Sequence, residues 1–187
     1  MTGSLEELKL QALACTRCAL AENRTHVVFG DGSPDAGVMV IGEGPGEAED
    51  LSGHPFVGRS GKLLVAIIEQ EMGLAREQIY IANTVKCRPP ANRNPTEGEV
   101  DACSTYLNTQ IELIDPDVII TVGAISTRAL LRRSDPIGKL RGSVYHYGGR
   151  PLVPTYHPAA ALRGGGKILA AMRADLALAK LTVAGAV

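Results

Sequence analysis

The chain has 187 residues, 45% hydrophobic and 21% charged, which suits one globular domain over residues 1–187 and excludes a disordered chain. The net charge is −1, but residues 1–80 carry 6 basic and 12 acidic side chains, whereas residues 81–187 carry 13 basic and 8 acidic ones. The second half can therefore still present a basic surface to phosphates. No apolar run approaches the roughly 20 residues of a membrane span, and the N-terminus lacks a signal-like apolar segment. We therefore expect a cytoplasmic protein without membrane partners.

Short apolar runs alternate with helical patterns along the chain. Four runs have the pattern of strands buried on both faces, and they cover residues 38–42, 79–83, 117–123 and 151–156. Helical patterns lie around them, over residues 4–13, 60–72, 96–114, 125–133 and 167–181. Thr96 and Glu99 form a capping box at the start of one helix, and Tyr145 and Tyr147 are compatible with an edge strand. The alternation predicts an α/β protein, a three-layer α/β/α sandwich with a central, mainly parallel four-stranded sheet.

In such a sheet, ligands bind at the loops that leave the carboxyl ends of the strands. These loops cover residues 43–58, 84–95, 123–126 and 157–166, and they hold most of the unusual residues. The glycine loop that follows the first strand is not a dinucleotide fingerprint, because the third glycine of G-x-G-x-x-G falls on Glu47. The segment around Lys62 is not a phosphate-binding Walker motif, because Leu63 follows the lysine and Phe56 replaces the first glycine.

Four cysteines form a second pattern: Cys15 and Cys18 are separated by two residues, and Cys87 and Cys103 follow later. Disulfides are not expected in a chain without a secretory signal. Two thiolates at this spacing can hold one metal centre, and two more can complete it. The spacing does not separate zinc from an iron–sulfur cluster. Either centre would tie the N-terminal helix to the loop and helix after the second strand, which indicates a structural role.

Four motifs occur in order along the chain: GEGPGE at 42–47, HPFVG at 54–58, NTVKCRPP at 83–90 and HPAA at 157–160. Together with the cysteines they resemble the family 4 uracil-DNA glycosylases, the iron–sulfur members of the uracil-DNA glycosylase superfamily. The resemblance runs from Cys15 to about the last helix. It implies the three-layer fold and a [4Fe-4S] cluster, rather than zinc, on Cys15, Cys18, Cys87 and Cys103.

The reaction that the resemblance implies is hydrolysis of the bond between uracil and deoxyribose, which leaves an abasic site for base excision repair. The base must first be flipped into a pocket. By resemblance, Phe56 stacks on uracil and the Asn83 amide pairs with its polar edge in a way that rejects cytosine. His157 donates a hydrogen bond to the developing uracil anion, and Glu43 orients water or stabilises the cationic sugar. The other substrate-binding residues are expected to be Gly42, Gly44 and Glu47.

The expected partner is uracil-containing DNA, single- or double-stranded, bound by a monomer. Contacts to DNA are expected from four basic residues, Lys86, Arg88, Arg93 and Arg163. Family members often carry larger apolar residues where this chain has Ala160 and Ala161. Leu162 is therefore the expected wedge into the base stack.

Three other functions compete with this interpretation. A related protein that links covalently to DNA after excising uracil uses a histidine in an inserted basic loop, but residues 86–97 contain neither. A non-catalytic, metal-stapled module that recognises damaged DNA is disfavoured by Glu43 and His157, which both lie at strand ends. An electron-transfer iron–sulfur protein would leave the glycine loop without a role.

Overall fold

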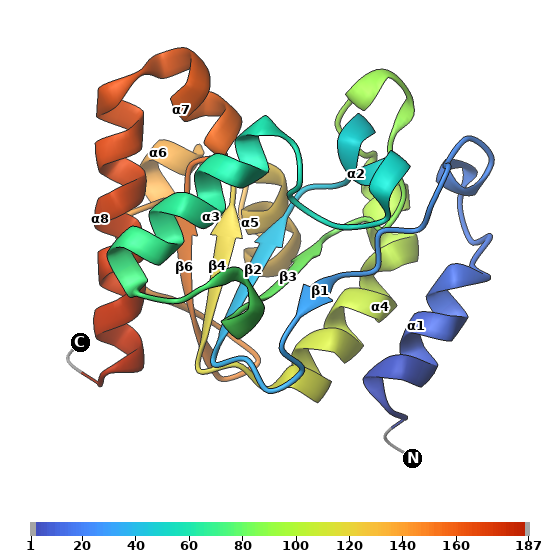
Figure 1. Cartoon of the computed structure of the whole chain (residues 1–187), viewed down its shortest axis with the longest axis horizontal. Helices are drawn as coiled ribbons and strands as arrows, with labels where there is room; N and C mark the ends of the chain where they lie inside the picture. Colours follow the sequence, from blue (N-terminus) through green and yellow to red (C-terminus); the bar gives the residue numbers. More distant parts are fainter. Residues whose placement is uncertain (1–2, 186–187) are drawn as a thin grey trace.

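The computed structural model describes residues 3–185, which form a six-stranded sheet with helices on both faces (Figure 1). In the spatial order of the sheet the strands are β1 (Asp31–Gly32), β3 (Tyr80–Asn83), β2 (Val38–Gly42), β4 (Val118–Val122), β6 (Arg150–Thr155) and β5 (Tyr145–Tyr147). The four inner strands are parallel, and the edge strands β1 and β5 are antiparallel to their neighbours. The α/β/α sandwich with a mainly parallel sheet is confirmed, but the sheet has six strands rather than four.

The extra strand β1 escapes sequence analysis because Asp31 and Gly32 carry no apolar signal, and their pairing with β3 is set by tertiary contacts. The helices in chain order are α1 (Leu5–Leu13), α2 (Glu47–Ser52), α3 (Arg59–Met72), α4 (Glu97–Ile114), α5 (Ala124–Leu131), α6 (Ile137–Leu140), α7 (Pro158–Gly164) and α8 (Gly166–Val183). Short 3₁₀ helices add η1 (Ala19–Ala21), η2 (Arg76–Gln78) and η3 (Pro90–Asn92).

Local sequence signals explain most helix ends. The capping box of α4 is present, with the Thr96 hydroxyl accepting from the Glu99 amide at 3.2 Å and the Glu99 carboxylate accepting from the Thr96 amide at 2.8 Å. Helix α3 begins at Arg59 with Gly58 as its N-cap, so the expectation that Ser60 caps this helix is wrong. The segment after His157, expected to be a loop, is instead the helix α7, which begins with Pro158 at a favoured first position.

The two faces of the sheet bury alternate residues of each strand. Val38 and Val40 of β2 pack with α3 and α8, whereas Met39 and Ile41 pack with α4 and α5. Helix α1 lies outside these layers, against α4 (Figure 1). The strand arrows point toward the end of the molecule where α2 and α7 lie, so the loops predicted to hold the site meet there (Figure 1).

None of the helices within residues 3–185 is long and apolar enough to cross a membrane.

Candidate active site

A cleft of about 550 Å³ opens at the carboxyl ends of the parallel strands, within the usual size of a small-ligand pocket. The sheet register explains why it forms there, because β2 and β3 pair so that Gly42 lies beside Asn83. Seven of the predicted site residues line the cleft: Glu43, Gly44, Phe56, Asn83, Arg93, His157 and Arg163. These residues come from segments that are far apart in sequence, namely the loops after β2 and α2, the end of β3, the residue after η3, and α7 with its N-cap.

Gly42 allows two recognition side chains to meet at the end of β2. A Cβ atom at this position would lie 2.5 Å from Phe56 Cζ and 2.5 Å from Asn83 Oδ1. Any other residue would displace the ring or the amide. The Phe56 and His157 rings lie with their centroids 6.5 Å apart and their planes tilted by 35°. The cleft thus offers an aromatic face, an amide and an imidazole to one ligand.

Asn83 carries an unsatisfied polar atom into this cleft. The residue is 2% exposed, and its Oδ1 atom is buried without a hydrogen-bond partner among residues 3–185. Leaving a buried acceptor unpaired costs free energy, typically about 1–3 kcal/mol. Because Asn83 also lines the cleft, a ligand bound there is one source of the missing N–H or O–H donor.

His157 is held as a neutral hydrogen-bond donor. It is the N-cap of α7, and its Nδ1 atom accepts from the Ala159 amide at 3.2 Å. Because Nδ1 accepts, the ring proton is on Nε2. Burial, and then the nearby Arg163 charge, lower the pKa of His157 below its usual 6.5. The imidazole is therefore neutral at physiological pH and presents Nε2–H as its free donor.

Glu43 follows Gly42 and brings a carboxylate to the same cleft. Its backbone is fixed, since the Glu43 carbonyl accepts from the Val85 amide at 3.2 Å and from the Thr84 hydroxyl. Burial raises the pKa of Glu43 above its usual 4.5. A partly desolvated carboxylate of this kind can act on water or on developing positive charge.

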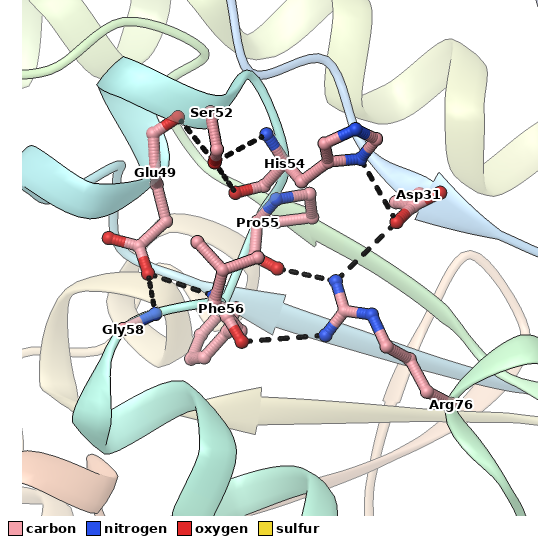
Figure 2. A network of polar contacts seen from close by, with 9 residues as sticks. Asp31, Glu49, Ser52, His54, Pro55, Phe56, Gly58 and Arg76 are labelled. Carbon is pink, nitrogen blue, oxygen red and sulfur yellow. Dashed lines mark hydrogen bonds and ion pairs between the residues drawn. The ribbon is translucent and has the colours of Figure 1, made fainter.

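The loop that carries Phe56, residues 54–58, is called the Phe56 loop below. Phe56 adopts a left-handed backbone with φ of 53°, which is unusual for a residue with a side chain. The Glu49 carboxylate accepts from the Val57 amide at 3.0 Å and the Gly58 amide at 2.8 Å (Figure 2). It also accepts from the Gly46 amide at 3.1 Å. Glu49 therefore ties the glycine loop to the Phe56 loop.

Glu49 lines the cleft, whereas the sequence pattern indicated Glu47. Glu47 is exposed and is not among the residues that line the cleft, and its carboxylate lies 3.8 Å from Arg88. Glu49 occupies the third position of α2 after Gly46, where a glutamate turns back to the cap. The Gly46–Glu49 spacing was the signal that identifies the inward carboxylate.

The prediction that Lys86 contacts DNA is wrong, because the side chain is buried. Lys86 is 2% exposed, and its Nζ atom donates to the Asn83 carbonyl at 3.0 Å and to Gln110 Oε1 at 2.5 Å. Burial lowers the pKa of Lys86 to about 8. A lysine enclosed in this way cannot reach a phosphate, and it instead supports the strand end that carries Asn83.

The other residues predicted to contact DNA lie at or near the mouth of the cleft. Arg93 forms two bonds with the Glu99 carboxylate, at 2.7 and 2.8 Å, which holds the pKa of Glu99 at about 2. Arg88 donates to Asn92 Oδ1 at 2.7 Å. On α7, Leu162 is 40% exposed and Arg163 is exposed at the cleft wall.

A second, smaller cavity brings the four cysteines together. It is lined by Cys15, Cys18, Cys87 and Cys103, which come from the end of α1, the turn before η1, the loop after β3 and α4. All four cysteines are free thiols. Among residues 3–185, no three histidine, cysteine or acidic side chains are arranged to hold a single metal ion.

The surroundings of this cysteine cavity suit an anionic, thiolate-bound group. Three cationic side chains, Arg17, Arg24 and Lys86, line it with the cysteines. Arg24 Nη1 donates to the Cys15 carbonyl at 2.7 Å and to Cys87 Sγ at 3.3 Å. The donor set therefore fits a group held by four thiolates whose negative charge the neighbouring cations balance.

A model of the uracil DNA glycosylase superfamily matches residues 29–180 of the chain. Among known proteins, the chain is 47% identical over 167 residues to a type-4 uracil-DNA glycosylase of Sulfurisphaera tokodaii, covering 85% of this chain and 76% of the relative. It is 51% identical over 156 residues to the type-4 enzyme of Saccharolobus solfataricus, covering 79% and 72%. It is 48% identical over 151 residues to the type-4 enzyme of Thermotoga maritima, covering 80% and 78%.

Proposed function

The chain belongs to the uracil-DNA glycosylase superfamily, with the type-4 enzymes, and from this premise we propose that its cleft excises uracil from DNA. The reaction hydrolyses the bond between uracil and deoxyribose and leaves an abasic site, the intermediate of base excision repair. The substrate is uracil flipped out of single- or double-stranded DNA.

The unpaired Oδ1 atom of Asn83 is the observation that carries this proposal. Uracil offers an N3–H donor beside its O4 acceptor, so the Asn83 amide can accept from N3–H and donate to O4. Cytosine presents an acceptor at N3 and a donor at N4, which would leave the amide with mismatched partners. Phe56 supplies the stacking face for the same base.

His157 and Glu43 act on the two charges that develop as the bond breaks. The neutral Nε2–H of His157 donates to the uracil oxygen as negative charge grows there, and a neutral donor does not protonate the base outright. Glu43 stabilises the oxocarbenium-like sugar and orients the attacking water. Gly42 leaves room for the Phe56 ring and the Asn83 amide, and Gly44, at the cleft wall, leaves room for the Val85 side chain.

Helix α7 and the neighbouring loop supply the contacts to DNA in this proposal. Leu162, the exposed apolar residue of α7, enters the base stack, and Arg163 faces the phosphates. Arg88 and Arg93 lie before and after η3, and they are the other two arginines that we propose contact phosphates.

Cys15, Cys18, Cys87 and Cys103 would hold the [4Fe-4S] cluster. When bound, the cluster supplies a structural cross-link between chain segments and takes no part in breaking the bond. The geometry supports this division, because within residues 3–185 the cysteine cavity and the cleft have no lining residue in common.

An end-labelled oligonucleotide with one uracil tests the proposal. After incubation with the holoenzyme, half of each sample receives alkali before denaturing electrophoresis. Alkali-dependent cleavage at uracil, absent with cytosine, is expected. A band retarded before alkali would indicate the covalent relative instead, and no product in either lane would contradict excision.

Matched variants place the reaction in the cleft. Glu43→Gln and His157→Ala should each reduce uracil release by about 10²–10³-fold while DNA binding is retained. Glu112→Gln and His146→Ala alter exposed residues of the same types and should leave release unchanged. Full activity in both cleft variants would contradict the assigned site.

A further inference from the structure

A network of polar contacts surrounds the Phe56 loop, and several of its residues have no role in the proposed uracil site (Figure 2). Its centre is Arg76, which lies in η2, between α3 and β3. The Arg76 guanidinium donates to two successive carbonyl groups of the loop, to Pro55 O at 2.5 Å and to Phe56 O at 3.4 Å. Asp31, on the edge strand β1, lies 3.5 Å from the same guanidinium.

These contacts act where the backbone is least favourable. Phe56 has φ of 53°, a conformation that a residue with a side chain avoids unless its surroundings stabilise it. Helix α3 already packs against the same backbone, since a Cβ on Gly61 would lie 2.2 Å from the Phe56 carbonyl carbon. Glu49 fixes the next two amides, at Val57 and Gly58. Arg76 fixes the two carbonyls that precede them, so donors and acceptors of the turn are held from two sides.

Asp31 keeps the guanidinium in place. The Arg76 side chain is 24% exposed and the Asp31 side chain is 40% exposed, so this ion pair is partly screened by water. The ion pair mainly orients Arg76, because Asp31 keeps the guanidinium beside the carbonyl groups of the Phe56 loop. The ring of His54, the first residue of the loop, also lies 3.3 Å from Asp31.

We infer that Arg76, held by Asp31, is a positioning residue that fixes the Phe56 ring in the orientation that stacks on the flipped base. This inference rests on the proposed function, because Phe56 is the stacking face of that site. Arg76 does not touch the base. It acts through the left-handed backbone of Phe56. Without Arg76 the loop can leave this conformation, and the Phe56 ring is then no longer held in place to stack on the base.

The first test measures the loop itself and needs no activity. In hydrogen–deuterium exchange of the holoenzyme, Arg76→Gln should raise the exchange rate of the Val57 and Gly58 amides about tenfold or more. Arg150→Gln is the matched control, because Arg150 also pairs with an aspartate, Asp115, but at the start of β6. Unchanged exchange at Val57 and Gly58 in Arg76→Gln would overturn the inference.

The second test asks whether Arg76 acts through Phe56. Under single-turnover conditions, Arg76→Gln should slow uracil release about tenfold to 100-fold while affinity for DNA changes less than about twofold. Arg76→Lys, which keeps the charge but not the two-pronged donor, should recover part of the rate. In a Phe56→Ala background, Arg76→Gln should cost less than about twofold.

The outcomes separate this inference from the proposed function. If the wild-type holoenzyme releases no uracil, the proposed function fails. If the wild type is active but Arg76→Gln is equally active, or its loss is the same with and without Phe56, the positioning role alone is overturned. A purely structural role would lower the melting temperature and leave the losses additive.

Discussion

The cleft and the cysteine cavity meet along one chain segment, residues 83–87, yet they are built in opposite ways. The cleft leaves a buried acceptor unpaired at Asn83 and holds Phe56 in a strained backbone. The cysteine cavity lies in an apolar cluster with Leu8, Leu20 and Tyr106, and cationic side chains are among the residues that line it. The cleft leaves the Asn83 acceptor without a neighbouring donor, whereas the cysteine cavity places the Arg24 guanidinium against Cys87 Sγ.

This difference shows how the molecule divides its work. A site that binds a ligand needs polar atoms whose partners are missing until the ligand arrives. A cross-link joins chain segments that are far apart in sequence, and the cysteines join the segment after α1 to the loop after β3 and to α4. Lys86 connects the two regions, because it follows the cleft residue Asn83, donates to its carbonyl and precedes Cys87.

Replacement of Asn83 should produce the largest effect on catalysis with little effect on stability. Asn83→Ala removes the amide that pairs with uracil, so the single-turnover rate should fall about 10²–10³-fold. The melting temperature should change by less than about 3 °C, because the lost Oδ1 atom has no partner in the free protein. Asn108→Ala, an exposed change on α4, is the control. A large loss of stability in Asn83→Ala would break the contrast.

Replacement of a cysteine should lower stability and activity together, unlike replacement of Asn83. Cys87→Ala removes one thiolate from the centre, so the bound iron should be lost and the melting temperature should fall by about 10 °C. Uracil release should decline in parallel, because the loop after Asn83 loses its anchor. Iron content, calorimetry and release rate are measured on the same samples. A Cys87→Ala protein with normal stability and normal release would contradict the cross-linking role.

The acid side of the pH profile should report the two titrating groups of the cleft. His157 acts as the neutral imidazole, and burial lowers its pKa below 6.5, so the neutral form persists as pH falls toward that lowered pKa. Glu43 acts as the carboxylate, and burial raises its pKa above 4.5. The single-turnover rate should thus fall as the pH drops through the lowered pKa of His157 and the raised pKa of Glu43, by at most about tenfold per unit for each group.

His157→Gln keeps an N–H donor near the Nε2 position without a titrating ring. The limiting slope of its acid limb should be about tenfold per pH unit smaller than in the wild type, because Glu43 alone remains to titrate. His157→Asn, which keeps the cap of α7 but shortens the donor, should be as slow as His157→Ala. An unchanged acid profile in His157→Gln would show that protonation of His157 does not contribute to the loss of activity at low pH.

The smallest effect is expected in the salt dependence of DNA binding, which tests the corrected position of Lys86. Arg163→Gln should reduce the slope of log affinity against log salt by about 0.7–0.9, the share of one phosphate contact. Lys86→Met should leave that slope unchanged, because the buried ammonium reaches no phosphate. Equal reductions in the two variants would restore Lys86 to the DNA interface.

The sequence predicts the parts of the molecule that are set by local pattern. Buried strands stand out as apolar runs, and Gly42, Asn83 and His157 follow from their place at strand ends. The Thr96–Glu99 box marks the start of α4 within one residue. The family motifs add the chemistry of these positions.

The parts that sequence analysis missed depend on contacts between distant residues. Lys86 lies among basic and proline residues, as a surface loop would, and only Gln110 on α4 shows why it is buried. Arg76 donates to carbonyl groups about 20 residues earlier in the chain, and no sequence motif links these positions. The edge strand β1 has two residues and no apolar character.

Equilibrium binding of an uncleaved substrate tests recognition by the cleft most directly. An oligonucleotide with 2′-fluoro-2′-deoxyuridine resists hydrolysis, because fluorine destabilises the cationic sugar, and its cytosine counterpart is the control. The wild-type holoenzyme should bind the uracil analogue at least about tenfold more tightly than the cytosine one, and Asn83→Ala should abolish that preference. Equal affinities in the wild type, or a preference that survives in Asn83→Ala, would contradict uracil recognition by the Asn83 amide.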